Sequence, residues 1–146
     1  MKTNLTFAAV LAVSASLLGG CASVSSRDLQ TMQGTWVGHD LGDREIECRM
    51  TIKGTSLKFT SARQNDWNNY EWYNCRFTLD PTAHPKRADI FVEDCSAPQF
   101  NRKTAKAIYR IEGTTLTIAS KEPGADSLPA GFDAGGDARV VVFNRQ

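Results

Sequence analysis

Histidine is scarce in this sequence, and its only long apolar run lies near the N-terminus. Among the 146 residues there are two histidines, His39 and His84. Neither lies in a Cys/His spacing typical of a metal site. No local arrangement of Ser, His and Asp or of Cys and His indicates an activated nucleophile. We therefore expect no metal, no cofactor and no enzymatic activity.

The chain also lacks an excess of charge of either sign. It has 17 Lys and Arg residues against 16 Asp and Glu residues, and one of the lysines is Lys2 in the N-terminal segment. The rest of the chain is therefore neutral. A domain that binds nucleic acid usually presents a basic surface to the phosphates. We expect no nucleic acid among the partners.

Residues 1–20 have the composition of a secretory signal peptide. A basic start at Lys2 is followed by an apolar run over residues 5–18, which ends in small residues. A membrane-spanning helix needs about 20 apolar residues, so this run is too short to cross a bilayer. Small residues are what a signal peptidase accepts at its cleavage site. We expect residues 1–20 to be cleaved.

The stretch Leu18-Gly19-Gly20-Cys21 resembles the bacterial lipobox, whose cysteine becomes the lipidated N-terminus of the mature chain. Two or more acyl chains on Cys21 would hold the protein firmly on a membrane. Ala22 replaces the Asp that usually retains a lipoprotein in the inner membrane, so the resemblance implies the periplasmic face of the outer membrane. We expect residues 21–26 to form a polar tether. The alternative is a secreted protein that is cut elsewhere.

From Gln33 onward, apolar residues recur at every second position, which is typical of β-strands. In residues 44–53, for example, Ile46, Cys48 and Met50 alternate with charged or polar residues. Turn residues separate such runs. Eight strands are expected, over residues 34–39, 44–53, 56–61, 71–80 and 88–94, as a pair within 106–120, and over 138–145.

Eight consecutive antiparallel strands with short connections favour an up-and-down β-barrel, because closing a sheet on itself removes its exposed edges. We therefore predict an all-β fold for a single domain over residues 27–146. The only helical signal is a turn or two within residues 26–33, with Ser26 as a possible cap.

Three stretches resemble a bacterial lipocalin-like domain family: Gln33-Gly34-Thr35-Trp36, residues 79–90 and residues 108–118. The resemblance covers Leu29 to about Arg145 and implies a lipocalin-like barrel. In the wider lipocalins, a Trp in a Gly-x-Trp motif plugs the closed end, and an Arg from the last strand lies over it. The resemblance thus assigns Gly34, Trp36 and Arg145 to this plug.

Successive loops of such a barrel alternate between its two ends, so the loops after the first, third, fifth and seventh strands, which form the longer set, are expected together at one open end. Aromatic residues gather in and beside these loops, and we predict that they form the mouth of a ligand site: Trp67, Tyr70, Trp72, Phe100 and Phe132. They could equally pack on one another as a lid. Side chains could also fill the interior, because small barrels often have no cavity.

Three cysteines remain beyond Cys21, and an oxidising periplasm would permit one disulfide among them. Strand counting puts Cys75 and Cys95 on neighbouring strands on either side of one turn, and we expect these two to pair. Cys48 lies two strands from Cys75, too far for a bridge. It is then a buried free cysteine, or alternatively a reactive thiol.

Two functions fit these expectations. The first is a membrane-anchored binding module for a small apolar or amphipathic ligand, held at the loop-bearing end of the barrel. The second is an interaction or inhibitor lipoprotein whose loops contact an envelope protein or a hydrolase. A hollow barrel would favour the first function, and a barrel filled by its own side chains would favour the second.

Overall fold

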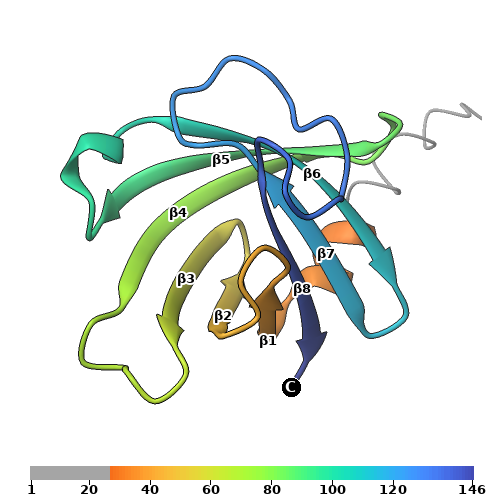
Figure 1. Ribbon diagram of the computed structural model, residues 1–146. Helices are drawn as coiled ribbons and strands as arrows, with labels where there is room; N and C mark the ends of the chain where they lie inside the picture. Colours follow the sequence, from red (N-terminus) through yellow and green to blue (C-terminus); the bar gives the residue numbers. More distant parts are fainter. Residues whose placement is uncertain (1–26) are drawn as a thin grey trace, which may run out of the picture.

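A computed structural model describes residues 27–146, which form one closed β-barrel (Figure 1). The expected signal peptide, Cys21 and the tether lie outside the described residues. Every strand pairs with the next along the chain, and the last pairs with the first. The expectation of an all-β, eight-stranded antiparallel barrel is confirmed. Its strands are β1 (Gly34–Asp40), β2 (Ile46–Lys53), β3 (Ser56–Arg63), β4 (Glu71–Asp80), β5 (Lys86–Cys95), β6 (Thr104–Glu112), β7 (Thr115–Ser120) and β8 (Arg139–Arg145).

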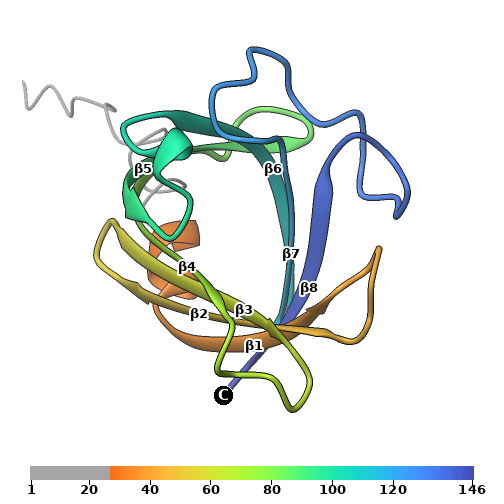
Figure 2. The ribbon, with the colours of Figure 1, turned by 60° about the vertical axis from the view of Figure 1, so that its left-hand side comes forward.

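The alternation of apolar and polar residues determines which side chains enter the barrel. In β2, Cys48, Met50 and Ile52 are buried, whereas the residues between them lie on the outer surface. Because successive side chains of a strand point to opposite faces, a single apolar face in each strand is enough to build the core. Figure 2 looks into the ring that the strands form, with the short helix visible through it.

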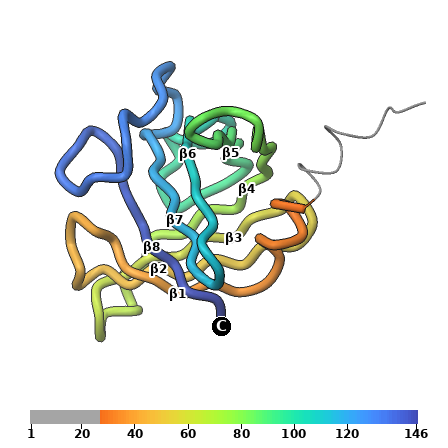
Figure 3. The backbone as a smooth tube through the Cα atoms, turned by 90° about the vertical axis from the view of Figure 1, so that its right-hand side faces the viewer, coloured from red at the N-terminus to blue at the C-terminus, as the bar shows by residue number. Residues whose placement is uncertain are grey.

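The long loops lie at one end of the barrel and the tight turns at the other. Figure 3 shows the loops of residues 41–45, 64–70 and 121–138 on one side of the molecule and the short helix on the opposite side. Two tight turns at the opposite end contain Gly54 and Gly113, each with φ of 62°. Glycine adopts this left-handed conformation without a steric penalty. The barrel therefore has a loop-bearing end and a closed end.

The closed end is plugged by Trp36, whose side chain is completely buried. Its indole Nε1 donates a hydrogen bond to the carbonyl oxygen of Met32 at 2.9 Å. The guanidinium carbon of Arg145 lies 4.3 Å from the centroid of the Trp36 ring, within cation–π range. Arg145 also donates to the carbonyl oxygens of Gln33 and Thr31. A side chain at Gly34 would meet Arg145, so these residues form one cluster.

A short helix over residues 27–32 covers this plug and is fixed by a buried carboxylate. Asp28 Oδ2 accepts hydrogen bonds from the Tyr109 hydroxyl at 2.8 Å and from Lys86 Nζ at 2.7 Å. Burial and the neighbouring Asp28 raise the pKa of Tyr109 well above its usual value, so its hydroxyl remains a donor. No helix within residues 27–146 has both the length and the apolar character needed to cross a membrane.

The barrel closes where β1 lies against β8, and Gly38 permits that approach. Gly38 pairs with Phe143, and a Cβ atom at residue 38 would lie 2.0 Å from the carbonyl oxygen of Val142. No side chain can occupy that space without moving the backbone. Closure of the barrel therefore requires glycine at this position.

We expect Gly38→Ala to lower the free energy of unfolding by roughly 2–4 kcal/mol, because the added methyl group separates two paired strands. The control is Gly136→Ala, whose Cβ would make only an ordinary contact at 3.6 Å. That change should alter stability by less than about 0.5 kcal/mol. Urea unfolding followed by circular dichroism measures both, and equal stabilities would contradict the role of Gly38.

Candidate functional site

The loop-bearing half of the barrel contains a cavity of about 440 Å³. Its wall is mainly apolar and comes from both sides of the ring, including Met50, Leu57, Ile90, Val92, Ile118 and Val141. The other half of the interior is filled by the plug and by large side chains such as Phe77, Tyr109 and Leu116. The barrel is thus hollow at one end only.

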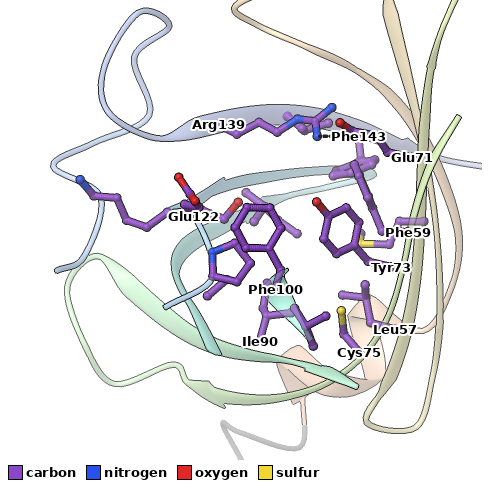
Figure 4. A pocket seen from close by; sticks show the side chains of 18 of the residues that line it. Leu57, Phe59, Glu71, Tyr73, Cys75, Ile90, Phe100, Glu122, Arg139 and Phe143 are labelled. Carbon is purple, nitrogen blue, oxygen red and sulfur yellow. Dashed lines mark hydrogen bonds and ion pairs between the residues drawn. The ribbon is translucent and has the colours of Figure 1, made fainter. Parts of the chain in front are cut away.

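Aromatic side chains form one wall of this cavity. The ring centroids of Phe59 and Tyr73 are 6.1 Å apart, and those of Phe59 and Phe143 are 6.5 Å apart in an edge-to-face arrangement. Both separations fall in the range that favours aromatic pairs. Figure 4 shows Phe100, from the loop between β5 and β6, facing these rings across the cavity.

Arg139, the first residue of β8, lines the cavity at its edge, beside Glu71 (Figure 4). Its guanidinium carbon is 5.3 Å from the centroid of the Phe59 ring. Its Nε donates to Asp40 Oδ2 at 2.8 Å, and its Nη1 donates to Glu71 Oε2 at 3.2 Å. A charged group inside an apolar cavity needs such partners, because an unpaired charge is costly to bury. The site therefore has an apolar interior and a charged group beside it.

Further charges lie where the β7–β8 loop crosses the opening. Lys121 is largely buried and pairs with the exposed Asp137, and the exposed Glu122 lies next to it. Within residues 27–146, no three His, Cys, Asp or Glu side chains are grouped closely enough to hold a metal ion. His39 is exposed at the loop-bearing end, and His84 lies in the β4–β5 turn at the closed end. The histidines are thus separated by the length of the barrel.

Of the aromatic residues assigned to the mouth, Phe100 alone lines the cavity. The Trp67 ring lies on the outer surface, 4.3 Å from the guanidinium carbon of Arg49. Phe132 packs outside the barrel on the cluster of Ile108, Ala119 and Val140.

Two other aromatic residues assigned to the mouth do not line the cavity either. Tyr70 is 47% exposed, and Trp72 occupies an outward position of β4, next to the inward-facing Tyr73. Trp67, Tyr70, Trp72 and Phe132 therefore do not line the cavity, although they lie at the same end of the barrel. Their assignment to a ligand mouth stays a prediction.

The side chains that do form the site lie on strands rather than in loops. Phe59 and Tyr73 fall on the inward-facing positions expected from alternation, but their place near the opening could not be read from spacing alone. Arg139 was missed as a cavity residue. The alternation along β8 could have identified it. Arg139, Val141, Phe143 and Arg145 occupy every second position, so the inner face of the strand has an arginine at each end.

Comparison of the chain with family models, curated proteins and solved structures found no match.

The expected disulfide between Cys75 and Cys95 is also wrong, because both cysteines are free and buried. The turn pairs Asp80 with Arg87, and a bulge follows, so Cys75 lies opposite Val92 while Cys95 lies opposite Tyr73. Such diagonal neighbours are about 7–8 Å apart, beyond the reach of a disulfide. Cys95 Sγ instead donates to the carbonyl oxygen of Ala97 at 3.0 Å.

Burial makes two of the thiols poor nucleophiles. It raises the pKa of Cys48 to about 11 and that of Cys75 to about 12, from an ordinary value of 9.0. Cys75 lines the cavity, and Cys48 lies beside it, with its sulfur 3.9 Å from Arg139 Nη2. The thiolate is the reactive form, so neither cysteine has the character of a catalytic nucleophile.

The cysteine assignment can be tested with a thiol reagent on a chain that begins at Arg27 and is purified without a reductant. After denaturation, Cys48, Cys75 and Cys95 should all react. In the folded protein at pH 8, Cys48 and Cys75 should react at least about 100-fold more slowly, since each unit of pKa lowers the thiolate fraction tenfold. A single reactive thiol after denaturation would contradict the assignment and indicate a disulfide.

Proposed function

We propose that the barrel is a non-catalytic binding module that holds a small amphipathic molecule in the cavity at its loop-bearing end. The observation that carries this proposal is the cavity itself, at about 440 Å³. Sites for small organic ligands are typically about 300–1,000 Å³ and mostly apolar, with a few polar groups that orient the ligand. The cavity has both properties.

The distribution of polarity sets the orientation of the ligand. The wall around Leu57 and Cys75 is apolar and lies deeper in the barrel (Figure 4), whereas Arg139, Glu71 and Lys121 lie at the loop-bearing ends of β8, β4 and β7. An apolar body would therefore enter first, and a polar end would remain near the loops. Burial of apolar surface would supply most of the binding free energy, at about 25 cal/mol per Å² before the costs of association.

The hollow interior favours this function over recognition of a protein by the loops. A protein-binding module has no need of a cavity, and the loop aromatics Trp67 and Phe132 already pack against the outer wall of the barrel itself. They are therefore less available as anchors for an envelope protein or a hydrolase.

We further propose that the module is a lipid-anchored member of the lipocalin-like family. The support is in the sequence: the lipobox-like stretch ending at Cys21, and the residues around Gly34 and Trp36. The lipid would hold the barrel at the periplasmic face of the outer membrane. The described part of the chain begins with the helix at the closed end, so a lipid attached at Cys21 would leave the cavity opening at the far end of the barrel from the anchor (Figure 3).

Filling the cavity should abolish binding. Ala105 lines the cavity, and the change Ala105→Trp places a large side chain in the empty space. We expect it to weaken binding of the fluorescent dye N-phenyl-1-naphthylamine by about tenfold or more, since even 1.4 kcal/mol of lost binding energy has that effect. Dye fluorescence measures binding, and thermal unfolding checks the fold.

The matched control is Trp67→Ala, which removes an aromatic side chain that lies outside the cavity. Dye binding to this variant should equal that of the unmodified protein. If Trp67→Ala weakens binding and Ala105→Trp leaves it intact, the ligand binds at the loops rather than in the cavity.

A further inference from the structure

We propose that the polar end of the ligand is a carboxylate or a similar anion, which binds Arg139 in place of Glu71. This inference rests on the proposed binding function and specifies the class of ligand. It follows from the unequal way in which the two carboxylates hold Arg139, and from a second hydrogen-bond donor in the same wall.

Asp40 is the fixed partner of Arg139. Its side chain is 13% exposed, and while Oδ2 accepts from Arg139 Nε, Oδ1 accepts from the backbone N–H of Gly42 at 2.8 Å. Removing one member of a buried ion pair leaves the other charge uncompensated, which is strongly unfavourable. Asp40 therefore stays with Arg139 whether or not a ligand is bound.

Glu71 is the exchangeable partner. Its side chain is 60% exposed, and the same oxygen, Oε2, accepts from Arg139 Nη1 at 3.2 Å and from the Ser61 hydroxyl at 3.3 Å. Exposed ion pairs contribute little, because water solvates the carboxylate almost as well. Glu71 can therefore turn into solvent at small cost and free Nη1 of the guanidinium, while Nη2 remains 3.9 Å from the Cys48 sulfur.

Arg139 cannot withdraw in the same way. Asp40 holds it on one side, the Phe59 ring lies against its guanidinium, and its own side chain is 30% exposed. A guanidinium stays charged and offers five N–H donors in a planar fork that matches a carboxylate. An anion that replaces Glu71 leaves the net charge around Arg139 unchanged, whereas a cation would bring a like charge next to it.

Tyr73 provides the second donor. Its ring packs on Phe59, the ring that Arg139 also contacts, and Figure 4 shows its hydroxyl pointing into the cavity. Burial, followed by the nearby Glu71, raises the pKa of Tyr73, so the hydroxyl is protonated at neutral pH and can donate. A carboxylate at this point would meet the Arg139 fork and the Tyr73 hydroxyl together, with its apolar body among the aromatic rings.

The experiment compares three probes that share one alkyl chain and differ in their polar end: decanoate, decanol and decyltrimethylammonium. Isothermal titration calorimetry of the purified protein, below the micelle concentration of each probe, gives the affinities. We expect decanoate to bind at least about tenfold more tightly than either of the others, because hydrogen bonds to charged groups are the stronger ones.

Three variants test the assignment of residues. Glu71→Gln should tighten decanoate binding about two- to fivefold, since it removes the competing exposed charge. Tyr73→Phe should weaken it about two- to tenfold through loss of one hydrogen bond. Arg139→Gln combined with Asp40→Asn, which removes the pair without leaving a buried charge, should weaken it about 10- to 100-fold and should weaken decanol binding much less, because hydrogen bonds to a neutral hydroxyl are the weaker ones.

The control for the double variant is Arg76→Gln combined with Glu93→Gln, which makes the same change of charge at a more exposed ion pair on the outer surface, with Nε and Oε1 at 2.7 Å. This variant should bind decanoate as the unmodified protein does. Thermal unfolding checks that every variant folds. The exposed Glu71→Gln change decides the inference even if the double variant does not fold.

Two results would overturn the inference and leave the proposed function standing: equal or tighter binding of decanol or decyltrimethylammonium, or no gain in decanoate affinity on Glu71→Gln. If none of the three probes binds, the proposed function fails along with the inference.

Discussion

Closure of the ring at the contact between β1 and β8 is the constraint on which the rest of the structure depends. The backbone at Gly38 lies directly against that of Val142, and the resulting register sets Trp36 opposite Arg145 and Asp40 opposite Val141. The plug and the charged group of the cavity are therefore positioned by the same seam. An open sheet would leave both arginines of β8 without partners and would expose two strand edges.

The two arginines of β8 have different roles because their surroundings differ. Arg145 lies over the Trp36 ring and donates to backbone carbonyl oxygens, so its donors are used within the plug. Arg139 faces a cavity, and one of its two carboxylate partners is exposed and weakly held. Equivalent positions of one strand thus give a structural contact at the filled end and a group available to a ligand at the hollow end.

Sequence reasoning found the fold because the two-residue alternation is nearly unbroken, as in Cys48, Met50 and Ile52 of β2. It failed for the disulfide, because a bulge in the β4–β5 pairing separates Cys75 from Cys95. It also could not show that Trp67 and Phe132 pack against the outer wall, because loop conformation is not set by alternation. Arg139 was missed because a charged residue in an inward position needs partners, Asp40 and Glu71, that only the closed ring brings together.

The central claim is that the cavity at the loop-bearing end holds a small molecule, and native mass spectrometry of the gently purified protein tests it most directly. We expect a non-covalent adduct that denaturation releases, with the mass of a small amphipathic acid. Loss of that adduct from the spectrum of the Ala105→Trp variant would show that the molecule binds in the cavity. A bare chain mass, unchanged after incubation with a lipid extract, would contradict the claim.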